Sequence, residues 1–400
     1  MATTRRTAAW LLGCLVAAPA GGQINDFSLR PTGYLQMDFR SFRNWQPAVG
    51  EIDLARDERE LRRLRLGFEG GYRSLRFEVD TDLSDANDVL DAGGVLKDAF
   101  VELRVSRSLR LRAGQFKVPF DEEQLESASR TDMVERSLFT MAVAPGRDLG
   151  LMARGRLGER YTYAAGLFAG DGRTDDSRSG ATAAGRVVFA PRDSLRVAAG
   201  ATFGSVSEGA AAAPRGLLGS SVAGYLFSPA RHVDGFRSRG VLNASWTPGR
   251  FAFRSTAGLG RDTRHDQGAN FEDLPAVVTV GWAASAHWLV TGVRSGQNVE
   301  PEHGLFAGPG AVEVSLRYEG LSFDDAGPET SASSPALRAQ DVRAAKANAL
   351  TAGISWWPTR WVRLLGNASW ERFGSGEIAP ESGRRGEYFT ASARLQLRLP

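Results

Sequence analysis

The 400-residue chain carries 49 lysine and arginine residues against 46 aspartate and glutamate residues, a formal net charge of +3. This near balance argues against a polybasic nucleic-acid-binding protein, so no nucleic acid is expected as a partner. Beyond the first 20 residues, no run of about 18 apolar residues could form a transmembrane helix, and no Pro/Ser-rich linker divides the chain. We therefore expect one domain over residues 21–400.

The first 20 residues have the layout of a secretory signal peptide. Arg5 and Arg6 precede an apolar core, and Ala18-Pro19-Ala20 resembles an A-x-A cleavage site. We predict that residues 1–20 are a signal peptide. The only cysteine, Cys14, lies within it, so the mature chain is expected to lack disulfides, with lipid attachment at Cys14 as the alternative.

After this leader, apolar and polar residues alternate with a period of two. Leu109, Leu111 and Ala113, for example, alternate with Arg110 and Arg112. Such alternation is typical of strands with one face toward water and the other toward an apolar core or lipid. In chain order we expect sixteen strands, at 35–40, 63–69, 75–80, 101–105, 109–114, 148–154, 161–167, 186–189, 195–203, 239–246, 251–259, 280–288, 312–318, 350–356, 362–368 and 389–399.

The connections between these strands alternate between short and long. Short turns are expected at 70–71, 106–108, 158–160, 191–193, 248–250 and 358–360, and long loops at 41–60, 83–96, 118–146, 204–236 and 320–344. This layout is typical of bacterial outer-membrane barrels, which have short periplasmic turns, long extracellular loops and a lipid-facing apolar band. The connection 289–309 breaks the alternation, and 220–227 has the pattern of a further short strand.

Several short motifs stand out within this pattern. They are Arg62-Arg63-Leu64-Arg65-Leu66-Gly67, Asp98-Ala99-Phe100-Val101, Gly114-Gln115-Phe116-Lys117-Val118-Pro119-Phe120, Glu135-Arg136, Pro145-Gly146-Arg147 and the segment from Glu313 to Tyr318. Together they resemble the phosphate-selective porin O/P family of bacterial outer-membrane channels, over most of the mature chain. The resemblance implies a sixteen-stranded, usually trimeric barrel, a third loop folded into the lumen, and an arginine ladder for anions.

The candidate anion-binding residues lie at the expected constriction and along the strands. For the constriction we name Lys117, Arg130, Arg136 and Arg147, in or beside the 118–146 loop. The lumen ladder would consist of Arg40, Arg63, Arg65, Arg76, Arg104, Arg112, Arg154, Arg196, Arg254, Arg317, Arg363 and Arg394. Guanidinium groups stay charged and match phosphate oxygens, which lowers the barrier for anions. The alternative is that carboxylates on neighbouring strands pair with these arginines and cancel their field.

We therefore expect an outer-membrane porin that passes small anions, with phosphate or polyphosphate as candidate solutes. The 118–146 loop holds Asp121, Glu122, Glu123 and Glu126, which departs from a lysine-rich phosphate site. The alternatives are a general, weakly selective porin and a non-conducting structural or surface-binding barrel. From the resemblance we expect a homotrimer.

Enzymatic and metal sites are not expected. Among the four histidines only His287 falls within an expected strand, so a serine–histidine–acid arrangement for hydrolysis is not predicted. The acids from Asp80 to Asp91 lack the spacing and the final glutamate of a calcium loop. We expect neither catalytic residues nor a cofactor nor a metal.

Overall fold

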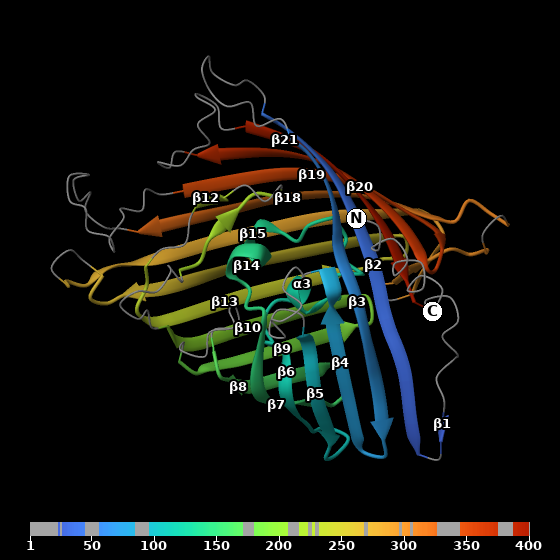
Figure 1. Cartoon of the computed structure of the whole chain (residues 1–400), viewed down its shortest axis with the longest axis horizontal. Helices are drawn as coiled ribbons and strands as arrows, with labels where there is room; N and C mark the ends of the chain where they lie inside the picture. The colour runs from blue at the N-terminus through green and yellow to red at the C-terminus, as the bar shows by residue number, and fades with distance from the viewer. Residues whose placement is uncertain are drawn as a thin grey trace, which may run out of the picture.

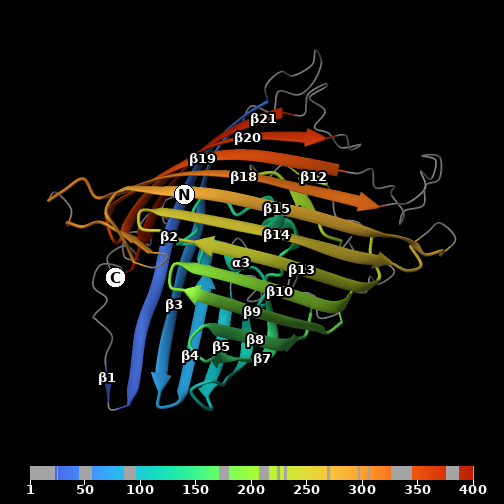
Figure 2. The same cartoon turned by 180° about the vertical axis from the view of Figure 1, so that it is seen from behind.

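Sixteen antiparallel strands form one closed barrel, which confirms the predicted fold class. The computed structural model describes residues 23–24, 26–44, 56–84, 96–170, 180–206, 216–222, 226–228, 232–267, 271–295, 298–304, 307–325, 345–374 and 387–399. The predicted signal peptide, residues 1–20, lies outside this part of the chain. The wall closes where β21 (Glu387–Arg398) pairs with β2 (Phe27–Asn44), as Figure 1 and Figure 2 show from opposite sides.

Each barrel strand pairs with the barrel strand that follows it along the chain. The strands between β2 and β21 are β3 (Arg56–Tyr72), β4 (Leu75–Asp82), β5 (Leu96–Arg104), β6 (Arg110–Lys117), β7 (Arg147–Leu157), β8 (Tyr161–Phe168), β9 (Thr182–Arg192), β10 (Leu195–Val206), β13 (Gly235–Trp246), β14 (Phe251–Arg264), β15 (Leu274–Thr291), β18 (Ala311–Asp325), β19 (Ala345–Thr359) and β20 (Val362–Gly374). A short β1 (Gln23–Ile24) pairs with the start of β2.

Short and long connections alternate around the barrel, with one correction to the predicted turns. Gly70 and Gly71 do not form a turn, because they pair with Leu29 and Ser28 within the β2–β3 ladder. The chain turns later, at Arg73, which has a positive φ of 55°. Strand β3 therefore continues to Tyr72, beyond residue 69 where the predicted strand ends.

The two irregular connections form small hairpins of their own. At the short-turn end, the segment between β15 and β18 holds β16 (Val293–Ser295) paired with β17 (Asn298–Glu300). The segment between β10 and β13 holds β11 (Gly219–Ser220) paired with β12 (Leu226–Ser228). The segment 220–227, expected to hold one short strand, instead contains the end of β11 and the start of β12, which form a two-stranded sheet separate from the wall.

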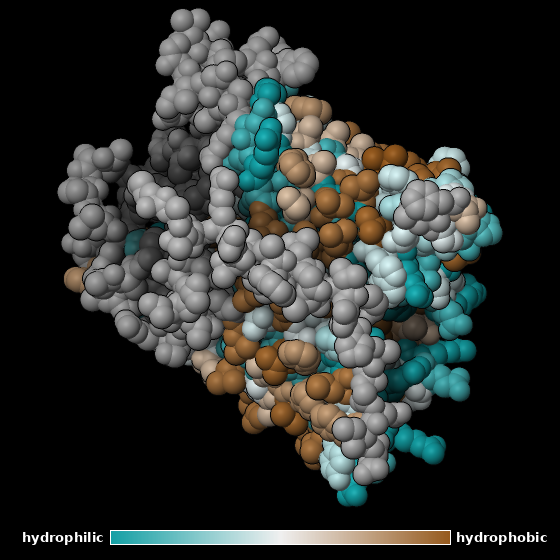
Figure 3. Space-filling view, turned by 45° about the vertical axis from the view of Figure 1, so that its right-hand side comes forward, coloured by the Kyte–Doolittle hydropathy of each residue, from teal (hydrophilic) through white to brown (hydrophobic). Residues whose placement is uncertain are grey.

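The alternation places apolar residues on the outer face and polar residues on the inner face. Val187, Leu242 and Leu316 are 51%, 62% and 51% exposed, whereas Asp38 and Arg394 are 1% and 3% exposed. Figure 3 shows the apolar residues in brown across the outer wall, with hydrophilic residues gathered at one rim. Within the described residues, no helix has the length and apolar character needed to cross a membrane.

The orientation of neighbouring residues on β9 can be tested with a matched pair. Val187 faces outward, and Val188 faces inward onto an open cavity. We expect Val187→Arg to reduce the free energy of unfolding by about 2–4 kcal/mol, because lipid does not solvate the guanidinium, and Val188→Arg to cost far less. Urea titration of both variants folded into lipid vesicles measures this, and equal costs would contradict the assigned faces.

Candidate permeation pathway

The third long connection, which we call the inner loop (residues 118–146), lies inside the barrel. Wall side chains hold its backbone at several points. Gln36 Nε2 donates to the Ala128 carbonyl at 2.9 Å, and Arg363 Nη1 donates to the Thr131 carbonyl at 2.7 Å. The Val134 amide donates to Asn367 Oδ1 at 2.6 Å. Buried backbone groups need such partners, so the loop is fixed against β2 and β20.

Two short helical segments shape the inner loop. These are α3 (Glu122–Leu125) and α4 (Leu138–Val143). Asp121 caps α3 by accepting from the Gln124 amide, and Ser137 caps α4 by accepting from the Thr140 amide. The buried face of α4 packs with the β11–β12 hairpin and the inner faces of β13, β15 and β18–β21 in one apolar cluster. That half of the lumen is therefore filled near the long-loop end.

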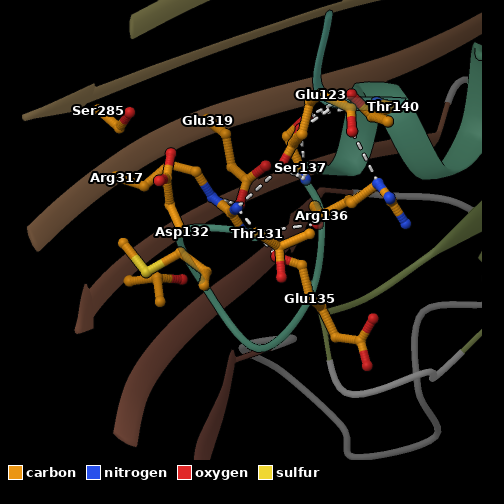
Figure 4. A network of polar contacts seen from close by, with 12 residues as sticks. Glu123, Thr131, Asp132, Glu135, Arg136, Ser137, Thr140, Ser285, Arg317 and Glu319 are labelled. Atoms are coloured by element: carbon orange, nitrogen blue, oxygen red, sulfur yellow. Dashed lines mark hydrogen bonds and ion pairs between the residues drawn. The ribbon is translucent and has the colours of Figure 1, made fainter. Parts of the chain in front are cut away.

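A buried network joins the two helical segments to β18 (Figure 4). Arg317 donates from Nε to Glu319 Oε1 at 2.9 Å and from Nη1 to the Glu135 carbonyl at 3.0 Å. Glu319 also accepts from the Leu138 amide at 2.6 Å, and Glu123 accepts from the Ser137 hydroxyl at 2.6 Å. The desolvation cost of burying these charges is offset by the hydrogen bonds among them, so the network fixes the position of the inner loop.

Opposite the filled half, a cavity of about 810 Å³ runs between the inner loop and the wall of β3–β9; we call it the main chamber. Its lining reaches from Asp98 and Arg147, near the long-loop end, to Arg107 and Arg156, beside the short turns. Its cations are Lys117, Arg65, Arg76, Arg107, Arg110, Arg112, Arg130, Arg147, Arg154, Arg156 and Arg186, against the carboxylates Glu69, Glu78, Asp80 and Asp98. The chamber surface therefore carries excess positive charge.

Part of this charge is neutralised by close ion pairs. Glu102 accepts from Arg112 Nη2 at 2.8 Å and from Arg154 Nε at 2.7 Å, while Asp98 accepts from Arg147 Nη2 at 2.7 Å. The Arg112 guanidinium also lies over the ring of Phe100, 3.7 Å from its centroid. Only those N–H groups of these arginines that do not bond a carboxylate remain available to an anion.

Arg130 is the predicted constriction residue with the greatest access to solvent. It is exposed and lines both the main chamber and a cavity of about 350 Å³ at the short-turn end, which we call the second chamber. Across the described residues, its guanidinium has no carboxylate partner within 4.0 Å. The second chamber is lined by the cations Arg30, Arg130, Arg294, Arg360, Arg363 and Arg398 and by the carboxylates Asp132, Glu300 and Glu313. Arg130 thus stands where the two chambers meet.

The other three predicted constriction residues are engaged in bonds. Lys117 Nζ donates to the carbonyls of Gln124 and Glu126, both at 2.7 Å, and so caps the end of α3. Arg136 donates to the Glu123 and Glu126 carbonyls, both at 2.9 Å, and lines neither chamber. Arg147 is paired with Asp98, as described above. Lys117 and Arg136 therefore hold the inner loop in shape.

The twelve ladder arginines all occupy inward positions, but the inner loop covers part of that face. Arg65, Arg76, Arg112 and Arg154 line the main chamber, and Arg363 lines the second. Seven line neither chamber: Arg40, Arg63, Arg104, Arg196, Arg254, Arg317 and Arg394. Within the described part of the chain, nine of the twelve have a carboxylate within 4.0 Å, namely Arg40, Arg65, Arg76, Arg112, Arg154, Arg196, Arg254, Arg317 and Arg394.

Four arginines of the main chamber were not among the predicted site residues. Arg110 and Arg186 stand on the inward positions of β6 and β9, so the period-two pattern could have found them. Arg107 lies in a short turn and Arg156 near the end of β7, where alternation says little about direction. The sequence signal that could have identified Arg107 and Arg156 is their place in or next to the short turns predicted at 106–108 and 158–160.

Glu126, in the inner loop, has a raised pKa. Burial, together with the neighbouring charge of Asp132 and against the opposing effect of Arg254, raises its pKa to about 7. Arg254 Nη1 lies 3.2 Å from Glu126 Oε2 and 3.0 Å from Asp132 Oδ2. Because Leu125 and Ser127 on either side line the main chamber, the charge of Glu126 changes close to it.

Solved structures with the same fold are outer-membrane proteins. The anion-selective porin from Comamonas acidovorans is 14% identical, with 93% of this chain and 99% of that chain covered and a TM-score of 0.59. The outer-membrane channel DcaP of Acinetobacter baumannii is 10% identical, with 95% and 99% covered and a TM-score of 0.60. OmpT of Vibrio cholerae in its trimer form is 11% identical, with 94% and 100% covered and a TM-score of 0.56.

Sequence comparison gives the more specific assignment. Among curated proteins, none matches the chain significantly. The family model for phosphate-selective porin O and P matches residues 31–398, nearly all of the barrel. With the closed barrel and its outer-membrane neighbours, this match identifies a channel protein of the bacterial outer membrane. The chain belongs to the phosphate-selective porin O and P family.

Proposed function

We propose that this porin passes small anions, phosphate among them, along the main chamber, past Arg130 and through the second chamber. The observation that carries this proposal is the charge of the main chamber, where ten arginines and one lysine face four carboxylates. A lumen with excess fixed positive charge concentrates anions and lowers the barrier to their passage. The protein acts in this proposal as a passive channel and not as an enzyme.

The arrangement of the arginines supports passage over tight binding. Most chamber arginines share their charge with a carboxylate, such as Arg112 and Arg154 with Glu102. An anion would therefore meet several weak sites in succession and not one deep well, as conduction requires. Arg130, with no such partner within the described residues and a place in both chambers, would attract an anion with a charge that no bonded carboxylate offsets.

A general, weakly selective porin is the second candidate function. It is favoured by the nine ladder arginines that lie within 4.0 Å of a carboxylate, because paired charges attract anions less strongly at a distance. Reversal potentials of single channels in a salt gradient separate the candidates. Anion bias supports the proposal, no bias supports a general porin, and no conductance supports a non-conducting barrel.

The role of Arg130 can be tested by reversing its charge. We expect Arg130→Glu to lower the anion-to-cation permeability ratio roughly 30-fold, since reversing a unit charge about 7 Å away in water raises the energy of an anion and lowers that of a cation by about 1 kcal/mol each. Arg104→Glu is the matched control, because Arg104 is exposed on the inner-face register of β5 but lines neither chamber. Equal ratios in the two variants would place the route elsewhere.

Arg136 is unsuitable for the same test, although it lies on the same loop. Its hydrogen bonds to the Glu123 and Glu126 carbonyls hold the inner loop, so Arg136→Glu would change the loop's shape together with its charge. The selectivity of that variant would report on loop structure as well as on charge. Arg130 alone separates the two effects, since its guanidinium bonds no loop carbonyl within the described residues.

The raised pKa of Glu126 predicts a pH dependence of ion selectivity. Above its pKa of about 7 the carboxylate is charged and offsets Arg254, and below that value it is neutral while Arg254 keeps its charge. We expect the anion preference to rise as the pH falls from one unit above this pKa to one unit below it. Glu126→Gln should remove this step in the reversal potential, and an unchanged step in that variant would assign it to another group.

Two further features of the protein remain proposals. We propose that residues 1–20 are a cleaved signal peptide and that residues 21–400 form one barrel domain in contact with outer-membrane lipid. We also propose a homotrimer, which is supported by the trimer form of the structurally similar Vibrio cholerae protein. Cross-linking in native membranes with gel electrophoresis tests the trimer directly.

A further inference from the structure

A histidine and two carboxylates from three separate segments meet inside the barrel. Asp132 comes from the inner loop, His287 from β15 and Glu313 from β18, and one potential ligand atom of each lies within 4.8 Å of the others. Sequence analysis predicted no metal site, and these three residues have no characteristic spacing along the chain. We infer that they form a binding site for a transition-metal ion of the zinc type.

The hydrogen bonding of His287 leaves one ring nitrogen available. The side chain is 1% exposed, and Nε2 lies 3.0 Å from the hydroxyl of Ser285. Nδ1 is shielded from water yet has no hydrogen-bond partner within the described part of the chain. Metal-binding histidines typically use one nitrogen as ligand while the other is oriented by a hydrogen bond. Ser285 supplies that orientation and directs Nδ1 toward Glu313.

The distance between Nδ1 and Glu313 fits coordination better than direct hydrogen bonding, whereas Asp132 faces the other ring nitrogen, Nε2. Glu313 Oε1 lies 3.6 Å from Nδ1, and Asp132 Oδ2 lies 3.5 Å from Nε2. Both distances exceed those of good hydrogen bonds. Ligand atoms around a tetrahedral zinc ion with bonds of about 2.0–2.1 Å stand roughly 3.3 Å apart. Asp132, on the loop, would turn its carboxylate toward Nδ1 to complete the set.

Two arginines border the cluster and bond its carboxylates. Arg294 contacts Glu313 through Oε2, which leaves Oε1 facing His287. Arg254 Nη1 lies 3.0 Å from Asp132 Oδ2. These positive charges weaken binding of a cation relative to an isolated donor set, but the hydrogen bonds also orient the carboxylates, as outer-shell partners do. The donor oxygen of Glu313 remains free of arginine.

The second chamber gives access to the site. Asp132 and Glu313 line it, so a metal held by these two residues and His287 would keep a fourth position open toward water or a passing anion. One nitrogen and two carboxylate donors suit zinc and similar ions, whereas calcium and magnesium favour sites made of oxygen alone. Binding would also link the inner loop to β15 and β18.

Calorimetric titration of the folded, EDTA-treated protein in detergent with zinc chloride tests the site. We expect one zinc ion per chain, and an affinity at least about tenfold weaker in His287→Gln and in Glu313→Gln. His303→Gln is the matched control, because His303 is exposed in the connection between β15 and β18, and it should bind zinc as the wild type does. Heat-modifiable gel migration of each variant confirms that the barrel is folded.

A second measurement reports on the link between loop and wall without using conductance. Zinc should raise the thermal unfolding temperature of the wild type and of His303→Gln, but not that of His287→Gln, and magnesium should raise neither. The inference is overturned by wild-type protein that binds no zinc. It is equally overturned if zinc binds the His287→Gln and Glu313→Gln variants with wild-type affinity. Both results are independent of which ions the channel passes.

Discussion

Buried contacts between the inner loop and the wall decide where the lumen is open. Arg317 and Glu319 are almost completely covered, with side chains 5% and 0% exposed, and between them they bond the backbone at Glu135 and Leu138. Removing one partner of such a pair typically costs about 3–5 kcal/mol, because the other charge is left buried. The loop is therefore held firmly to one half of the wall, and the main chamber occupies the other half.

The distribution of charge follows from this asymmetry. Where the loop meets the wall, arginines are used to satisfy carbonyls and carboxylates, as Arg363 does with the Thr131 carbonyl. Where the wall faces the main chamber, pairs such as Arg147–Asp98 stay partly solvated and leave some donors unused. Arginine thus serves two purposes in one barrel, and the same residue type at equivalent strand positions differs in role according to whether the loop covers it.

Much of the wall could be predicted from the sequence, because a period of two is a local property. One strand shows the limit: β3 contains a bulge at Arg62, so Leu61 faces outward before it and Leu64 after it. The roles of Lys117 and Arg136 could not be predicted, because they depend on where α3 ends inside the barrel. The meeting of Asp132, His287 and Glu313 depends on contacts between segments far apart in the chain, which no local pattern records.

The seating of the inner loop also has a consequence for how the barrel is assembled. Its partners lie far along the chain: Asn367 is 233 residues from Val134, and Gln396 is 267 residues from Ser129, to which it donates. Contacts of such long range form late, after the costly closure of large chain loops. The inner loop thus precedes in the chain the strands that hold it. Inner-face side chains of β20 and β21, such as Asn367 and Gln396, find their hydrogen-bond partners on this loop. The contacts that seat the loop are thus completed by β20 and β21, and β21 is also the strand whose pairing with β2 closes the wall.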